Sequence, residues 1–247
     1  MSLLDKIIRE LQENNINHNS IKAEMSWTER IKIINKISNL SDKKRFYKRV
    51  EATKDIAKLN YYKYCVKHVA KDIALSGIWV EMGVHKGRTI NILNRFKEEL
   101  FPSSSQVIHG FDSFKGLPEA WKPGFGKGRF ATSVPELKRC QLHVGWFKDT
   151  LPDFAEANKD KKIALLHVDC DLYSSTKETF KHLGPLVTKG TVILLDEIIG
   201  DSHHVNHEYK AFMEFVKEYK IELEWIAYIA NGAQAACIVK NIGVNDN

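Results

Sequence analysis

The chain has 247 residues, of which 43% are hydrophobic and 28% are charged. This is the composition of an ordinary globular protein of one or two domains, and it excludes a collagen-like or largely disordered chain. The formal net charge is +6, and residues 1–75 carry all of it. A basic segment can meet nucleic acid, but no run of five basic residues occurs, so a solvent-exposed helical face is favoured.

Neither a membrane segment nor a disulfide framework is expected. The longest apolar stretch without charges, residues 225–239, is shorter than the ~20 residues of a membrane-spanning helix. Charges within residues 5–10 interrupt any signal-peptide core. The four cysteines show no C-x-x-C spacing, which predicts reduced thiols in a cytoplasmic protein.

The first 75 residues are expected to be a helical extension preceding a second unit at residues 76–247. Ser26 and Glu29 have the spacing of a capping box, and an isoleucine stripe follows at residues 31, 34 and 37. A second helix is predicted from Ser41 or Asp42 to Gly77, with no glycine or proline to break it. We expect these helices to pack on the core or to form a homo-oligomer interface, because their apolar stripes must be buried.

After Gly77, predicted strands and helices alternate. The strands are predicted at residues 78–82, 106–111, 142–146, 163–168 and 191–195, the helices at 88–100, 174–187 and 207–219, and a long loop at 113–135. Asn231-Gly232 is a strong hairpin signal between residues 222–229 and 233–240. This order predicts an α/β fold with a buried, mostly parallel sheet and a final antiparallel hairpin.

Polar residues occur at the carboxyl ends of four predicted strands, the edge where such sheets bind ligands. They are Glu81, Gly83 and Gly87 at the first strand, Asp112 at the second, Asp169 and Asp171 at the fourth, and Asp196 and Glu197 at the fifth. So many acids at one edge call for a cation or for hydrogen-bond donors. The structural alternative is that they cap helices.

The first two strands suggest a nucleoside-containing cofactor. The pattern Glu81-x-Gly83-x-x-x-Gly87 differs from the G-x-G-x-x-G fingerprint, which disfavours a nicotinamide-dependent enzyme. Asp112 lies at the end of the next strand, where an acid can accept hydrogen bonds from both hydroxyls of a ribose.

Five motifs together resemble the macrocin O-methyltransferase (TylF/MycF-like) family. They are Trp79-Val-Glu-Met-Gly-Val-His-Lys-Gly-Arg-Thr89, Gly110-Phe-Asp-Ser-Phe-Lys-Gly-Leu-Pro118, Gly145-Trp-Phe-Lys-Asp-Thr-Leu-Pro152, Leu166-His-Val-Asp-Cys-Asp-Leu-Tyr-Ser-Ser-Thr176 and Leu194-Leu-Asp-Glu197. The resemblance covers residues 76 to about 240. It implies the class I methyltransferase fold, a Rossmann-like seven-stranded sheet whose last strand is antiparallel. It also implies methylation of a sugar hydroxyl or another small acceptor by S-adenosylmethionine, with Mg²⁺ or Mn²⁺.

The resemblance also implies roles for individual residues. The cofactor would contact Glu81, Gly83 and Gly87 through its methionine part, Asp112 and Ser113 through its ribose, and Gly145 and Trp146 through its adenine. Thr89 and Asp169 would be further cofactor contacts. The metal ligands would come from Asp169, Asp171, Asp196 and Glu197. At the last position the family usually has a second aspartate, so the geometry at Glu197 differs by one methylene.

Methyl transfer to an alcohol suits these residues. A hard cation held by oxygen ligands lowers the pKa of the alcohol, and Asp169 or Asp171 could accept its proton. Loop 113–135, with Trp121, Lys122, Lys127 and Arg129, could be a substrate lid.

Two alternatives stay open at this point. His203, His204 and His207 could form a transition-metal site, although a polar loop is favoured because the H-E-x-x-H pattern is absent. A non-catalytic or nucleic-acid-associated binding protein with a methyltransferase-like core is the alternative function.

Overall fold

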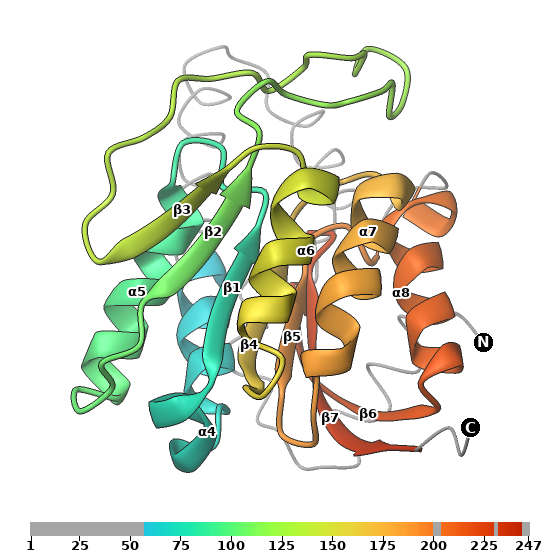
Figure 1. Ribbon diagram of the computed structural model, residues 1–247. Helices are drawn as coiled ribbons and strands as arrows, with labels where there is room; N and C mark the ends of the chain where they lie inside the picture. The colour runs from blue at the N-terminus through green and yellow to red at the C-terminus, as the bar shows by residue number, and fades with distance from the viewer. Residues whose placement is uncertain (1–56, 200–203, 230–231, 244–247) are drawn as a thin grey trace, which may run out of the picture.

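A seven-stranded sheet forms the centre of the molecule in the computed structural model, which describes residues 57–199, 204–229 and 232–243 (Figure 1). The strand order is β3-β2-β1-β4-β5-β7-β6. Neighbours from β3 to β5 are parallel, whereas β7 is antiparallel to both β5 and β6. The predicted fold class is therefore confirmed. The strands are β1 (Ile78–Met82), β2 (Ile108–Asp112), β3 (Cys140–Val144), β4 (Ile163–Val168), β5 (Val192–Leu195), β6 (Ile221–Tyr228) and β7 (Ala235–Ile242).

Helices cover both faces of the sheet, as Figure 1 shows. One face carries α6 (Phe147–Ala157), α7 (Tyr173–Leu183) and α8 (Glu208–Glu218), and the other carries residues 57–67, α4 (Lys71–Ser76) and α5 (Arg88–Leu100). Two short 3-10 helices, η2 (Gly184–Leu186) and η3 (His204–Asn206), complete the described elements. Helix α6 has no counterpart among the predicted helices, because Trp146 stands at its N-cap and Pro152 inside it. None of the described helices has the length and apolar character that crossing a membrane requires.

The predicted uninterrupted helix ending at Gly77 is wrong in its described part. The chain turns at residues 68–70, where the amide of His68 donates to the carbonyl of Cys65 (3.0 Å) and Ala70 is extended. Nδ1 of His68 lies 2.8 Å from the carbonyl oxygen of Tyr64, so the side chain competes for the helical backbone. The helix predicted from Ser26 and the start of the one predicted from Ser41 lie outside the described residues.

Alternation along each strand divides the core into two clusters. In β1, Val80 and Met82 pack with residues of α6, α7 and α8, whereas Trp79 packs on the opposite face. The second cluster also contains Tyr61, Tyr62, Cys65 and Val66 from the segment 57–67. The described part of the predicted extension is therefore built into the core of the sheet.

Candidate active site

Backbone hydrogen bonds bring the residues that follow the strands to one level at the carboxyl edge. Each of these residues donates its amide hydrogen to the carbonyl oxygen near the end of a neighbouring strand, which continues the parallel ladder past the strand ends. The bonds run from Gly145 to Asp112 (3.0 Å), from Gly83 to Phe111 (2.9 Å), from Asp169 to Met82 (2.9 Å) and from Asp196 to Val168 (3.0 Å).

A cavity of about 810 Å³ opens above this edge. Its volume lies within the range of small-molecule and cofactor sites. Most of the predicted site residues line it, namely Gly83, Asp112, Ser113, Gly145, Trp146, Asp169, Asp171, Asp196 and Glu197. Glu81, Gly87 and Thr89 do not line the cavity.

Glu81 lies beneath the cavity, within the sheet. Its side chain is 1% exposed, and its Oε2 lies 3.6 Å from Nδ1 of the equally buried His167. Neither of these two atoms has a hydrogen-bond partner within normal distance. Burial raises the pKa of Glu81, and His167 opposes that rise. The ring of Tyr62 meets His167 edge to face at 5.8 Å, so segment 57–67 closes this buried cluster from below.

Asp112 joins the two loops that frame the cavity. Its Oδ2 accepts the amide of His85 at 2.8 Å, and its Oδ1 accepts the amide of Phe114 at 2.7 Å. Each carboxylate oxygen has a second lone pair, so both can still accept a ligand hydroxyl.

The acids at the edge repel one another. The pKa of Asp169 is raised well above its ordinary value by burial and by the charges of Asp196 and Asp171. Burial and Asp196 likewise raise the pKa of Asp171 to about 6. Glu208, at the start of α8, is fully buried, and burial raises its pKa well above the ordinary value. Such a cluster is stabilised either by protonation or by a cation.

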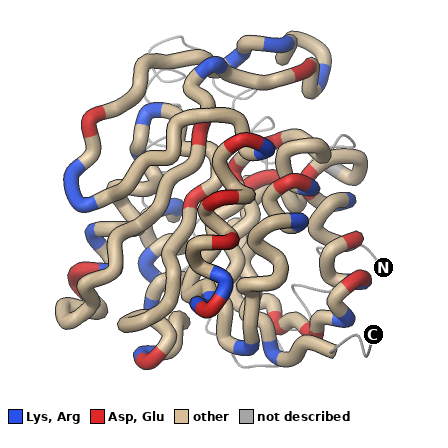
Figure 2. Tube along the Cα trace, in the orientation of Figure 1, with Lys and Arg blue, Asp and Glu red and all other residues tan. Residues whose placement is uncertain are grey.

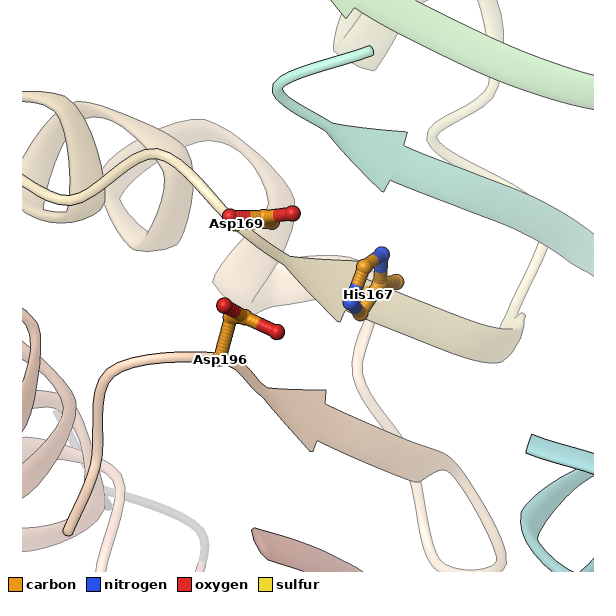
Figure 3. Close-up of side chains that lie close together, drawn as sticks. All are labelled: His167, Asp169 and Asp196. Atoms are coloured by element: carbon orange, nitrogen blue, oxygen red, sulfur yellow. The ribbon is translucent and has the colours of Figure 1, made fainter. Parts of the chain in front are cut away.

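The side chains of two of these acids and of His167 lie close enough together to hold a metal ion. Ligand atoms of His167, Asp169 and Asp196 all lie within 4.8 Å of one another (Figure 3). Nε2 of Gln234 donates to Oδ1 of Asp196 at 2.9 Å and so orients that carboxylate. Among the described residues Asp171 and Glu197 are not part of this group, although both line the cavity.

Backbone conformation at the edge is specialised. Gly83 has φ = +88°, and a Cβ there would lie 1.9 Å from the carbonyl oxygen of Asp169, so this position accepts only glycine. Asp171 has φ = +60°, a left-handed conformation uncommon outside glycine. Sparsely populated conformations of this kind cluster at functional sites.

Sequence reasoning missed His167, Tyr62 and Glu208 as members of the site. His167 offered a signal, since it is the one polar residue in the strand 163–168 and precedes Asp169 by two positions on the same face. Tyr62 and Glu208 offered no such signal, because they lie in the segment 57–67 and in α8, away from the strand ends in the sequence. Of the predicted histidine cluster, His203 and the side chain of His204 lie outside what the structure describes, and His207 does not line the cavity.

Comparisons with known proteins place part of this chain among methyltransferase sequences. Residues 80–198 match the family model described as "Methyltransferase domain". A tetracenomycin-C 4'-O-methyltransferase of Streptomyces olivaceus is 25% identical over 63% of this chain and 66% of its own length. A demethyldecarbamoylnovobiocin O-methyltransferase of Streptomyces niveus is 30% identical over 58% of this chain and 60% of its own. The chain thus spans less than two thirds of either relative.

Solved structures show the same fold. The calicheamicin methyltransferase CalS11 superposes with a TM-score of 0.63 at 20% identity, covering 87% of this chain and 94% of that one. The O-methyltransferase NovP superposes with a TM-score of 0.58 at 24% identity, covering 75% and 80%.

Proposed function

We propose that this chain, whose residues 80–198 match the methyltransferase-domain family, methylates a hydroxyl group of a small acceptor with S-adenosylmethionine. The observation that carries the proposal is the carboxyl-edge cavity, which joins the predicted cofactor residues to a cluster of half-buried acids. The names of both Streptomyces relatives, which are O-methyltransferases, support a hydroxyl acceptor, and a sugar hydroxyl is our preferred choice.

The residues that line the cavity fit the cofactor. Asp112 would bind the ribose hydroxyls, and Gly83 lets the methionine part approach the backbone. Gly145 and Trp146 would border the adenine. Glu81 would act from beneath the site, in contact with His167.

The acidic cluster fits a divalent cation. Asp169 and Asp196 offer carboxylate oxygens, and these favour Mg²⁺ or Mn²⁺, whereas the imidazole of His167 suits Mn²⁺ better than Mg²⁺. Asp171 and Glu197 remain candidates for further ligands from the cavity wall.

When bound, the cofactor supplies an electrophilic methyl group, and the cation supplies a charge that lowers the pKa of the acceptor hydroxyl. Asp171 would accept the proton that the hydroxyl loses, because a carboxyl with a pKa of about 6 is ionised at neutral pH yet basic enough for this task. Asp169 is the alternative proton acceptor. The cavity walls would hold the hydroxyl in line with the methyl group.

Calorimetric titration with S-adenosylmethionine and, separately, with NADH tests the cofactor. We expect S-adenosylmethionine alone to bind. Asp112→Asn should weaken its affinity about tenfold or more, because hydrogen bonds to a charged acceptor contribute ~1.5–3 kcal/mol each. Asp153→Asn on α6, which does not line the cavity, is the matched control. Equal affinities in the two variants would refute the placement of the cofactor.

Binding of Mn²⁺, followed by electron paramagnetic resonance, tests the metal without a known acceptor. Asp196→Asn should reduce Mn²⁺ affinity by about tenfold or more and leave S-adenosylmethionine binding nearly unchanged, since Asp196 is a candidate ligand of the metal and not one of the proposed cofactor contacts. Once an acceptor is known, chelation should abolish turnover. Full activity in excess chelator would show that the acids have a structural role.

A further inference from the structure

Acidic side chains gather at the carboxyl edge of the sheet, and Figure 2 shows their red positions together where β4 and β5 end. Like charges at short range repel one another, so such a cluster stays together only if neighbouring parts of the chain hold it. On the β5 side, the side chains of Glu208 and Gln234 supply such contacts. Neither of these two residues lines the cavity, so any role they have in the site is exerted through the acids.

Glu208 holds the backbone between the two acids that follow β5. The amide of Glu197, which belongs to the peptide that joins it to Asp196, donates to Oε1 of Glu208 at 3.1 Å. Glu208 is the first residue of α8, so this contact ties the start of the helix to the end of the strand. On either side, the amides of residues 196 and 198 donate to a carbonyl of β4 and to one just before β7, both at 3.0 Å. Three consecutive peptides are thus fixed, and the side chains of Asp196 and Glu197 both line the cavity.

Gln234 holds the side chain of Asp196. Its Nε2 donates to Oδ1 of that aspartate at 2.9 Å. Gln234 is only 5% exposed and directly precedes β7, the neighbour of β5 in the sheet, so this donor comes from within the protein. The hydrogen bond fixes the rotation of the carboxylate, whose ligand atom lies within 4.8 Å of those of His167 and Asp169. Backbone and side chain of Asp196 are therefore held separately, from two distant parts of the chain.

Both holding residues carry a buried polar atom that the fold itself does not use. Among the residues that the structure describes, Oε2 of Glu208, which is 0% exposed, has no hydrogen-bond partner, and neither has Oε1 of Gln234. Leaving such an atom buried and unpaired lowers the free energy of unfolding. Apolar side chains of similar length would fill both places without this loss, so stability alone does not account for a glutamate and a glutamine there.

We propose that Glu208 and Gln234 are positioning residues of the candidate metal site, which present Asp196 and Glu197 to a divalent cation. This inference rests on the proposed function and deepens it, because it names residues other than the ligands on which the affinity for the metal depends. Hydrogen bonds to ligand groups orient those groups, and loss of such a partner typically lowers metal affinity by about 10–100-fold.

Binding of Mn²⁺ to the full chain, followed by electron paramagnetic resonance, tests this role. Glu208→Met and Gln234→Met replace the polar group by an apolar one of similar length, and each should weaken Mn²⁺ binding by about tenfold or more. Glu208→Gln keeps an oxygen that can accept the amide of Glu197, so its Mn²⁺ affinity should match that of the parent. Thr179→Val is the matched control, because it removes a buried hydroxyl on α7 that donates to the carbonyl of Ser175 and does not line the cavity.

A purely structural role predicts a different result. An acid in the first turn of α8 favours the helix through its dipole. Glu208→Met would then lower the stability in urea but leave the Mn²⁺ affinity of the folded protein equal to that of Thr179→Val. Equal affinities of both methionine variants and the control would overturn the inference. An equal loss in Glu208→Gln and Glu208→Met would overturn the role of Glu208, because the hydrogen bond to Glu197 can still form in the first of them.

Urea denaturation shows which variants are folded, and if one methionine variant is not, the other decides. Calorimetric titration with S-adenosylhomocysteine separates the inference from the proposed function. If the parent binds Mn²⁺ no more tightly than the folded methionine variants, the inference alone fails. If the parent binds S-adenosylhomocysteine but no Mn²⁺, the metal part of the proposed function fails and the inference fails with it. If the parent binds neither, the proposed function fails as a whole.

Discussion

The two faces of the sheet treat buried titratable groups in opposite ways. On the face under α6, α7 and α8, His109 and His143 lie among phenylalanines, and burial lowers the pKa of both rings. On the other face and at the carboxyl edge, burial raises the pKa values of Glu81 and Asp169, and the charges of Asp196 and Asp171 add to the rise at Asp169. Burial favours the neutral form in both places, but Asp169 also lines the cavity, where a cation can replace the proton. Side chains along each strand alternate between the two faces of the sheet. Adjacent residues can therefore contribute separately to the stability of the fold and to the chemistry of the site.

The largest effect on stability is expected from the apolar face. Phe212 on α8 is 0% exposed and lies between Phe180 (ring centres 5.7 Å apart) and Trp225 (6.2 Å). Phe212→Ala should lower the free energy of unfolding by about 3–5 kcal/mol through the cavity it leaves. Urea denaturation measures this loss, with Val144→Ala, at a residue that is 54% exposed, as the control. The affinity of the folded variant for the cofactor should not change. If the variant were as stable as the parent, the assignment of fold stability to this apolar face would be wrong.

A smaller effect is expected from the histidine pair on the same face. Burial, and secondarily the charge of His143, lower the pKa of His109 to about 4. The unfolded chain therefore takes up a proton near pH 6.5 that the folded chain resists, and stability falls as the pH is lowered from about 6.5 toward 4. Because the ring is only partly buried, we expect a loss of about 1–2 kcal/mol rather than the full value of the shift.

Thermal unfolding of the parent and of His109→Gln at pH 7.5 and pH 5 measures this effect. The parent should lose more stability than the variant between the two pH values, because the glutamine does not titrate. The control compares the parent with His182→Gln, since the ring of His182 lies 2.8 Å from Glu178 on α7. An identical loss in parent and His109→Gln would exclude His109 as the cause.

The smallest effect distinguishes two adjacent tyrosines on the site face. The side chain of Thr89 acts on the hydroxyl of Tyr62 and opposes the rise of its pKa, whereas the buried hydroxyl of Tyr61 has no hydrogen-bond partner among the described residues. Tyr62→Phe should cost about 1 kcal/mol of stability and Tyr61→Phe less than half of that. Urea denaturation of both variants checks the order. The reverse order would show that Tyr62 does not support the buried cluster around His167.

Patterns along the chain predicted the sheet and the acids at its edge, because buried strands and the residues that end them are adjacent in sequence. The same patterns could not reveal His167 facing Glu81, since β1 and β4 pair across some eighty residues. They also missed α6, where Pro152 lies inside the helix and no polar side chain caps it. The patterns did not predict the turn at residues 68–70 either, because only the contact of His68 with the carbonyl oxygen of Tyr64 interrupts the helix.

The hydrogen bond between Ser174 and Glu119 has a consequence for how molecules enter and leave the cavity. Loop 113–135 follows β2 in the chain, and the hydrogen bond that Ser174 donates to Glu119 ties it to α7. Neither residue belongs to a strand, so breaking this bond would leave the pairing of the sheet unchanged. If the chain has the proposed function, an acceptor would enter and its product would leave at this rim of the cavity without a change in the stability of the sheet.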